Sequence, residues 1–314
     1  MAVRTTAPVA LPAQRDRSGV HRRRYWRPGW ATPWLFLAPA LAFFGMFKFW
    51  PSLEGMYLSL FHVQPYLGDQ WVGLANFQEA FEDPDLRAAV GHTVLDAAVQ
   101  VGGSILVGFL LALLLEGPAR HLRILRTAVF LPAVTAMVAV AELWGALLFP
   151  GQYGAVNSLL GHVGLGPLPF VSNPDSALWT VMLVQIWKSA PYDMVIFIAG
   201  LVGIDHELYE AASIDGAGAW QRLRAVTLPA LRPVTTIVLV LGLIRGLRVF
   251  TEIAVLTPGG GPGGSTESIV TLTYKTTVIG NDTGYAAAIS TLLLFATIIL
   301  TCLTLWWRTK RENA

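Results

Sequence analysis

This sequence is short of charged residues. Only 13% of its 314 residues are Asp, Glu, Lys or Arg, whereas soluble domains carry about 25%. Hydrophobic residues make up 54% of the chain. A chain with so little charge cannot cover a large soluble core with a polar surface, so the composition predicts a membrane protein that crosses the bilayer several times.

The patterns that mark most enzymes are also missing. The single cysteine, Cys302, lies in an apolar stretch, which excludes a disulfide framework. The six histidines lack the spacing of metal ligands, and no Ser/His/Asp arrangement surrounds a nucleophile turn. The glycine run at 259–261 lacks the Gly-Lys-Ser/Thr ending of a phosphate loop, and no Walker sequence occurs. We therefore expect no enzyme, no ATP hydrolysis and no bound metal or cofactor in this chain.

Six apolar stretches are long enough to cross a hydrocarbon core, which requires about 20 residues in a helix. The fold class predicted is an all-α bundle of six transmembrane helices. The expected spans are Trp34–Leu60, Thr93–Leu115, Ala128–Phe149, Ala177–Gly203, Val234–Leu256 and Tyr285–Trp307.

The distribution of Lys and Arg predicts the orientation of these spans. Seven of the 22 precede the first span, and three each follow the second, fourth and sixth. The loops on the other side contain Arg87 and Lys275. Because cytoplasmic loops are enriched in Lys and Arg, both termini and the loop at about 204–233 should be cytoplasmic. Residues 1–33 form an expected basic, disordered tail, and residues 34–314 the membrane domain.

The loop at 204–233 has an ordered pattern of its own. Asp205 is suited to cap a helix N-terminus, and Glu210 follows in its first turns, where the helix dipole favours negative charge. Gly216 and Gly218 should end or bend this helix. A second helix is expected from about Ala219 to Thr227, with Pro229 and Pro233 preventing its continuation.

This loop resembles the cytoplasmic coupling loop of permease subunits in ATP-binding-cassette importers, most closely those of the type I carbohydrate class. The resemblance rests on Glu-Ala-Ala, a glycine four residues later and a Leu-Pro ending, and it extends along the chain from about Trp34 to Trp307. One departure is Asp205, where the family usually has Pro. The resemblance implies that the ATPase-coupling residues are Glu210, Ala211, Ala212, Asp215, Gly216, Leu228 and Pro229.

Two spans carry polar side chains at membrane depth, where ionisable groups are costly and usually face a bundle interior or a wet path. In the fourth and fifth spans, helical spacing places these groups on one face each. The resemblance implies that both faces line the solute path. The residues involved are Gln185, Lys188, Ser189, Tyr192, Leu241, Arg245 and Arg248. For Lys188, Arg245 and Arg248 an alternative stays open: pairing with Asp193, Glu142 or Glu252 to hold the bundle together.

The resemblance also implies an assembly. A second permease subunit, two copies of an ATPase that uses ATP and Mg, and an extracytoplasmic binding protein are expected partners, in a bacterial or archaeal cytoplasmic membrane. The expected function is import of a sugar or oligosaccharide. Glycerol-3-phosphate, a polyamine or another small solute is an alternative, because three cations near the path could also suit an anion. An ion-coupled secondary transporter is a further alternative, although no inverted repeat is visible.

Overall fold

The computed structural model describes residues 31–64 and 68–312, so nearly all of the predicted basic tail at 1–33 lies outside the described residues. The chain divides into two compact units, residues 1–51 and 52–314. Helices dominate the described part of each unit. Within the described part of the chain, the only strands are β1 (Phe61–His62) and β2 (Gln70–Trp71), an antiparallel pair that follows the first helix.

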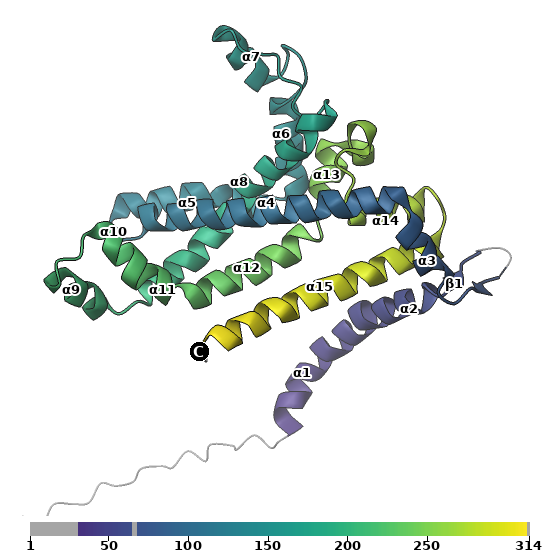
Figure 1. The fold of residues 1–314 in the computed structure, drawn as a ribbon, viewed down its shortest axis with the longest axis horizontal. Coiled ribbons are helices and arrows are strands. Elements are labelled where there is room, and N and C mark those ends of the chain that lie inside the picture. The colour runs from purple at the N-terminus through teal and green to yellow at the C-terminus, as the bar shows by residue number, and fades with distance from the viewer. Residues whose placement is uncertain (1–30, 65–67, 313–314) are drawn as a thin grey trace, which may run out of the picture. The chain divides into compact units, whose positions relative to one another are not determined.

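The helices and helical turns follow one another along the chain as shown in Figure 1. They are α1 (Ala31–Phe44), η1 (Gly45–Phe49), α2 (Trp50–Leu58), α3 (Ala75–Glu82), α4 (Pro84–Leu115), α5 (Arg120–Val134), α6 (Met137–Leu147), α7 (Ala155–His162), α8 (Pro174–Val202), α9 (His206–Ile214), α10 (Ala219–Arg222), η2 (Leu223–Thr227), α11 (Leu228–Ala230), α12 (Arg232–Gly246), α13 (Thr251–Leu256), η3 (Pro258–Gly260), η4 (Pro262–Gly264), α14 (Ile269–Val278) and α15 (Thr283–Glu312).

Four of these helical segments are long and apolar enough to cross a membrane: residues 32–58, α4, α8 and the stretch 283–308. Two bent pairs, α5 with α6 and α10–α11 with α12, raise the number to six if each pair is one span. The all-α fold and the multi-pass character predicted from the sequence are therefore confirmed.

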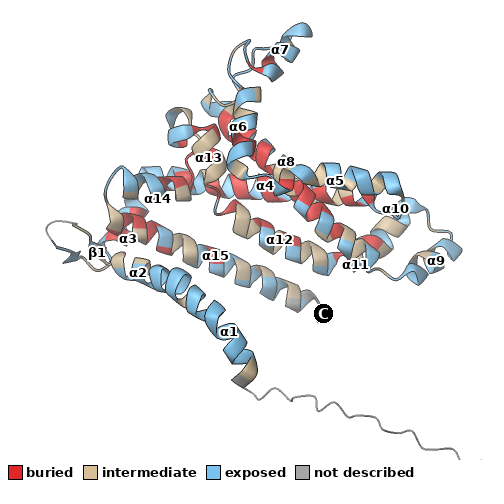
Figure 2. Ribbon diagram, turned by 180° about the vertical axis from the view of Figure 1, so that it is seen from behind, coloured by how far each residue is buried: buried red, intermediate tan, exposed pale blue. Residues whose placement is uncertain are grey.

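Helix α4 is the centre of the second unit, where it packs against α8 and α12 (Figure 1). Glycines allow this close approach. A Cβ atom added at Gly108 of α4 would lie 2.8 Å from the carbonyl oxygen of Ala190 in α8. One added at Gly246 of α12 would lie 2.9 Å from Cα of Ala97. The buried residues of α4 and α8 form the red core of Figure 2.

The third predicted span is broken rather than straight. Helix α5 ends at Val134, α6 begins at Met137, and their axes differ by 96°. Pro132 has no amide hydrogen to donate within the last turn of α5, which weakens the helix where it ends. Beyond the break, α6 packs against α13 around a buried cluster that includes Val140 and Ile253. The predicted span over 128–149 is therefore present as a bent pair of helices and not as one straight helix.

The fifth predicted span also differs. Helix α12 ends at Gly246, and a non-helical segment precedes α13. Arg248 lies in that segment and Glu252 lies in α13, so these residues and Arg245 do not form a stripe on one helix. The last residue of α12 before this interruption is Gly246, which lies against Ala97 of α4.

The expectation for Pro229 and Pro233 needs correction as well. Helical structure continues from Ala219 through Ala230 and resumes at Arg232 after a bend of 64°. A π-turn, η2, precedes Pro229, and the amide of Leu228 donates to the carbonyl of Leu223 five residues back. This wider turn lets the helix pass a proline that would clash with a regular turn. The same arrangement recurs at η1 before Pro51.

Candidate functional site

A cavity of about 400 Å³ lies where α8, α12 and α13 meet. Six of the seven residues predicted for the solute path line it. The lining residues are Gln100, Met137, Gln185, Lys188, Ser189, Tyr192, Ile244, Arg245, Arg248, Val249 and Glu252. Leu241, the seventh predicted residue, is 44% exposed and does not line the cavity.

An ion pair joins two walls of this cavity. Nη2 of Arg245 in α12 lies 2.7 Å from Oδ1 of Asp193 in α8. The Asp193 side chain is 1% exposed, whereas that of Arg245 is 36% exposed. Asp193 is thus a buried charge that Arg245 neutralises, which confirms one of the pairings that the sequence left open. The remaining carboxylate oxygen of Asp193 has no hydrogen-bond partner among the described residues.

Amide side chains also join α4 to α8. Nε2 of Gln185 donates to Oδ1 of Asp96 at 3.1 Å, and Nε2 of Gln100 donates to Oγ of Ser189 at the same distance. Asp96, Gln100 and Gln185 are all at most 5% exposed. Since a buried polar group without a partner is costly, these bonds fix the relative position of the two helices.

Lys188 forms no direct ion pair with a carboxylate of the described residues, although Glu252, one of the partners considered from the sequence, attracts it at longer range. Its Nζ donates to the carbonyl oxygens of Pro132, Ala133 and Thr135 at 3.2, 3.3 and 2.7 Å. The hydroxyl of Tyr192 also donates to Ala133 at 2.7 Å. The last carbonyls of a helix lack partners within it and carry partial negative charge. Lys188 and Tyr192 of α8 therefore cap the C-terminus of α5 at its break.

Arg248 and Glu252 complete the charged lining. The side chain of Arg248 is exposed and makes no hydrogen bond or ion pair with the described residues. The carboxylate of Glu252, in contrast, accepts from its own backbone amide and from that of Phe250, and Lys188 attracts it at longer range. Glu142, which was considered as a partner for the cations, is exposed on α6 and does not line the cavity. The structure thus places the three cations in three different environments.

Sequence reasoning missed Gln100 and the buried polar face of α4 to which it belongs. Thr93, Asp96, Gln100 and Ser104 are all buried on this helix. Their spacing of three and four residues was visible in the sequence and places them on one helical face. Met137, Ile244 and Val249 gave no such signal, because apolar residues occur on every face of these spans.

The predicted coupling residues lie mainly on a hairpin formed by α9, α10 and η2. The side chain of Asp205 caps α9 by accepting from the amide of Glu207 at 3.0 Å, as expected. The helix ends at Ile214, and the chain turns away at Gly216, whose φ is +78°. The amide of Ala217 donates to the carbonyl of Ala212 at 2.9 Å, which is the pairing of a glycine-terminated helix end.

Short-range bonds hold this hairpin together. The hydroxyls of Tyr209 and Thr227 lie 3.0 Å apart, and Nη1 of Arg222 donates to Oγ of Ser213 at 3.1 Å. Most side chains of α9 and α10 are exposed. The side chain of Glu210 is 69% exposed. Its Oε1 lies 3.3 Å from Nδ1 of His206, and it forms no other ion pair with the described residues.

Apolar side chains are exposed on the same hairpin. Ile214 is 87% and Trp220 70% exposed, and Leu208 and Leu228 are also exposed. Ala211 and Asp215 are exposed, whereas Ala212 and Pro229 are half-buried. The hairpin lies at the end of the second unit opposite α3 and β1 (Figure 1). Its surface combines a carboxylate, small residues and large apolar side chains.

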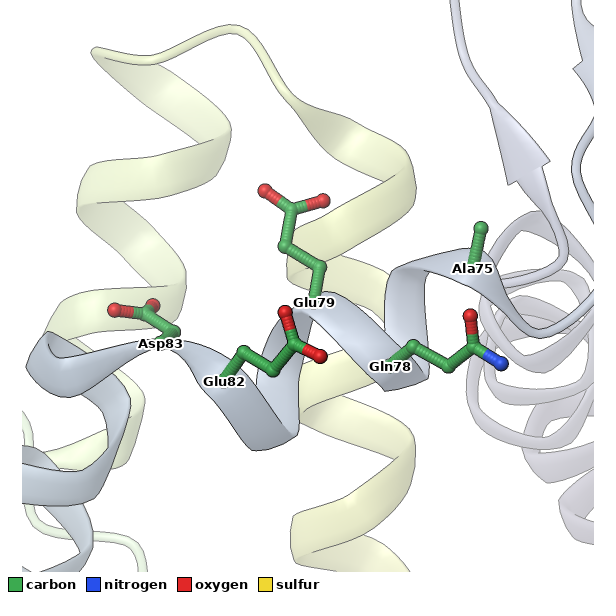
Figure 3. Close-up of a pocket in the computed structure, with 5 residues that line it drawn as sticks. All are labelled: Ala75, Gln78, Glu79, Glu82 and Asp83. Atoms are coloured by element: carbon green, nitrogen blue, oxygen red, sulfur yellow. The ribbon is translucent and has the colours of Figure 1, made fainter.

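A second hollow, of about 480 Å³, lies on α3 near the other end of that unit. Figure 3 shows Ala75, Gln78, Glu79, Glu82 and Asp83 around it, all from one helix and its end. Their side chains fan outward rather than converge. This acidic surface has no basic partner in its lining, and we assign no solute site to it. No group of three or more His, Cys, Asp and Glu suited to a metal occurs in the described residues.

Comparison with known proteins gives consistent results. Residues 104–310 match the family described as binding-protein-dependent transport system inner membrane component. The chain is 34% identical over 287 residues to the probable ABC transporter permease protein YurN of Bacillus subtilis (strain 168), covering 90% of this chain and 97% of that protein.

A second relative and a solved structure extend this likeness. The trehalose/maltose transport system permease protein MalF of Thermococcus litoralis is 33% identical over 260 residues, covering 82% of this chain and 87% of that protein. A crystal structure of a bacterial ABC transporter involved in the import of the acidic polysaccharide alginate contains a chain that superimposes with a TM-score of 0.78. That chain is 25% identical, and the match covers 88% of this chain and 95% of the other.

Proposed function

The chain belongs to the family of binding-protein-dependent transport system inner membrane components, and from that premise we propose that it is a permease subunit of an ATP-driven importer for a sugar or oligosaccharide. The relatives named for trehalose/maltose and for alginate support a saccharide solute. The observation that carries the proposal is the polar cavity among α8, α12 and α13.

The cavity has the chemistry that a saccharide requires. Gln185, Ser189 and Tyr192 line it with amide and hydroxyl groups on one face of α8, and each of them also makes one hydrogen bond within the bundle. Sugar hydroxyls need directional hydrogen bonds, and sugar rings pack against aromatic rings such as that of Tyr192. Met137 and Ile244 supply apolar contact. A second permease subunit would close the open side of this half-cavity, and a binding protein on the extracytoplasmic side would deliver the solute.

The hairpin is the proposed contact with a separate ATPase. Glu210 offers an exposed carboxylate, and Trp220 and Ile214 offer apolar area without any role in the packing of the chain. Closure of two ATPase copies on ATP would move the hairpin and bias the bundle between inward-open and outward-open states. ATP and Mg then belong to the partner. The basic residues of the hairpin and of the C-terminal end support a cytoplasmic position for both.

Reconstitution tests this function. The chain is combined in liposomes with a partner permease, an ATPase and a binding protein, and ATP hydrolysis is measured with and without solute-loaded binding protein. Stimulated hydrolysis with solute uptake is expected. In the Glu210→Lys variant, stimulation should fall at least tenfold without loss of assembly, because charge reversal affects an exposed contact.

Glu116→Lys is the matched control, since Glu116 is an exposed carboxylate near the same end of the unit but outside the hairpin. It should keep normal stimulation. Uptake by this chain alone, driven by a proton or sodium gradient without ATPase, would refute the proposal in favour of a secondary transporter.

A further inference from the structure

The charged side chains of the cavity differ in whether another group of the chain already neutralises them. Lys188, Arg245 and Arg248 line the cavity together with one carboxylate, Glu252. Asp96 is buried behind the wall and accepts from Gln185 rather than facing the cavity. The lining therefore contains more positive than negative groups, and the surplus depends on which cations are already neutralised.

Two of the cations have partners. Arg245 bonds to Asp193, whose side chain is buried. Lys188 directs its ammonium to three carbonyl oxygens at the end of α5, where the partial negative charge of a helix C-terminus stabilises a cation. Moving Arg245 away would leave the buried carboxylate of Asp193 without its counter-ion, which is costly, and the ammonium of Lys188 already donates to three carbonyl oxygens.

Arg248 is in a different position. It lies in the interruption between α12 and α13, and its exposed guanidinium makes no hydrogen bond or ion pair with the described residues. Arg248 also lines a smaller hollow, of about 130 Å³, between α14 and α15, which we call the α14–α15 hollow. Three hydroxyl groups, those of Thr273, Ser290 and Thr297, line that hollow as well. A guanidinium at this junction faces both spaces.

From this difference, and on the basis of the proposed function, we propose that the imported saccharide carries an anionic group, a carboxylate or a phosphate, and that Arg248 binds it. A guanidinium presents several donors in a planar fork that matches carboxylate and phosphate oxygens. The hydroxyl groups of the α14–α15 hollow would contact the sugar unit next to the one that carries the anionic group. Arg248 is then a specificity-determining residue that separates acidic saccharides from neutral saccharides of the same size.

The test uses the complete transporter in detergent and matched disaccharides: a neutral one, the same sugar oxidised to a uronate, and its 6-phosphate. The midpoint of thermal unfolding is followed against the concentration of each probe at constant ionic strength. A charged probe should raise the midpoint while the neutral probe does not, and the uronate and phosphate arms distinguish the two anions. In the Arg248→Gln variant the apparent affinity for the charged probe should fall at least tenfold.

Arg248→Lys should retain part of the affinity, because it keeps the charge but loses the fork. Arg123→Gln, which removes an exposed arginine of α5 outside the cavity, should retain all of it. The inference is overturned if neutral and charged probes raise the midpoint equally, if no charged probe raises it, or if Arg248→Gln binds normally. It is also overturned if Arg248→Gln only weakens subunit assembly, since Arg248 would then contact the partner permease.

A separate readout isolates the proposed function. Stimulation of ATP hydrolysis by solute-loaded binding protein is measured in liposomes with the unaltered chain. Loss of that stimulation refutes the importer, whichever sugar binds. Normal stimulation together with preference for neutral sugars refutes only the anionic solute.

Discussion

The cavity wall and the coupling hairpin are stabilised over very different distances along the chain. The wall bonds of Gln185, Ser189, Lys188, Tyr192 and Arg245 join residues between 52 and 89 positions apart. The hairpin bonds join residues at most 18 positions apart. The wall therefore exists only once the bundle has assembled, whereas the hairpin can keep its shape while the bundle around the cavity rearranges.

Burial shows the same contrast. The side chains of Asp96, Gln100 and Asp193 are at most 2% exposed, whereas α9 has no buried residue. Substitutions in the wall should therefore lower the free energy of unfolding. Substitutions in the hairpin should instead change the coupling to ATP hydrolysis. Four variants test this division, ordered by the expected change in stability.

Arg245→Met should have the largest effect, a loss of about 3 kcal/mol in the free energy of unfolding. That is the lower end of the range for a broken buried pair, because Arg245 is partly exposed. Asp193 would remain buried without its counter-ion. Thermal unfolding of the purified complex measures the loss. Adding Asp193→Leu should recover most of it, and a double variant no more stable than the single one would contradict the pairing.

Gly108→Ala comes next. The added methyl group would lie 2.8 Å from both the carbonyl oxygen of Ala190 and the Cβ of Asp193, and such overpacking costs about 1–3 kcal/mol. Gly102→Ala on the same helix is the matched control, since nothing lies within 4 Å of its added Cβ. Unfolding midpoints of the two variants should separate clearly. Equal midpoints would show that α4 and α8 are not in close contact in the assembled protein.

Tyr192→Phe removes one bond from the end of α5 and should cost about 1 kcal/mol, the usual contribution of a single hydrogen bond. Lys188 would still cap the helix. Tyr153→Phe is the control, because Tyr153 is 85% exposed and lies in the loop before α7. A midpoint for Tyr192→Phe equal to that of the control would indicate that the Tyr192 hydroxyl adds nothing to the cap.

Gly216→Ala should leave the unfolding midpoint unchanged although it strains the hairpin. A residue with a Cβ at φ of +78° costs roughly 1–2 kcal/mol locally. Stimulation of ATP hydrolysis should therefore decrease while the bundle stays intact. Gly218→Ala, at φ of −68°, needs no such conformation and serves as the control. A lowered midpoint for Gly216→Ala would show that the hairpin is part of the cooperative core.

The same contrast explains what the sequence could predict. The cap at Asp205 and the turn at Gly216 follow from neighbouring residues, so local rules find them. The long apolar helices follow from composition. Pro132 marks the break before Met137 locally, but the cap that satisfies it comes from Lys188, 53 residues beyond Thr135, and local rules cannot find that cap. The same limit applies to Arg248. It lies in an interruption between α12 and α13, whereas the hydropathy of the sequence predicts one span there.

The cap on α5 also has a consequence for related sequences. An ammonium group that satisfies the end of another helix links the identity of position 188 to the conformation of residues 132–135. A relative in which those residues continue as a straight helix would have no free carbonyls there, and lysine at 188 would become an unneutralised charge in the bilayer. Lysine at this position and a broken third span should accordingly be gained and lost together during divergence.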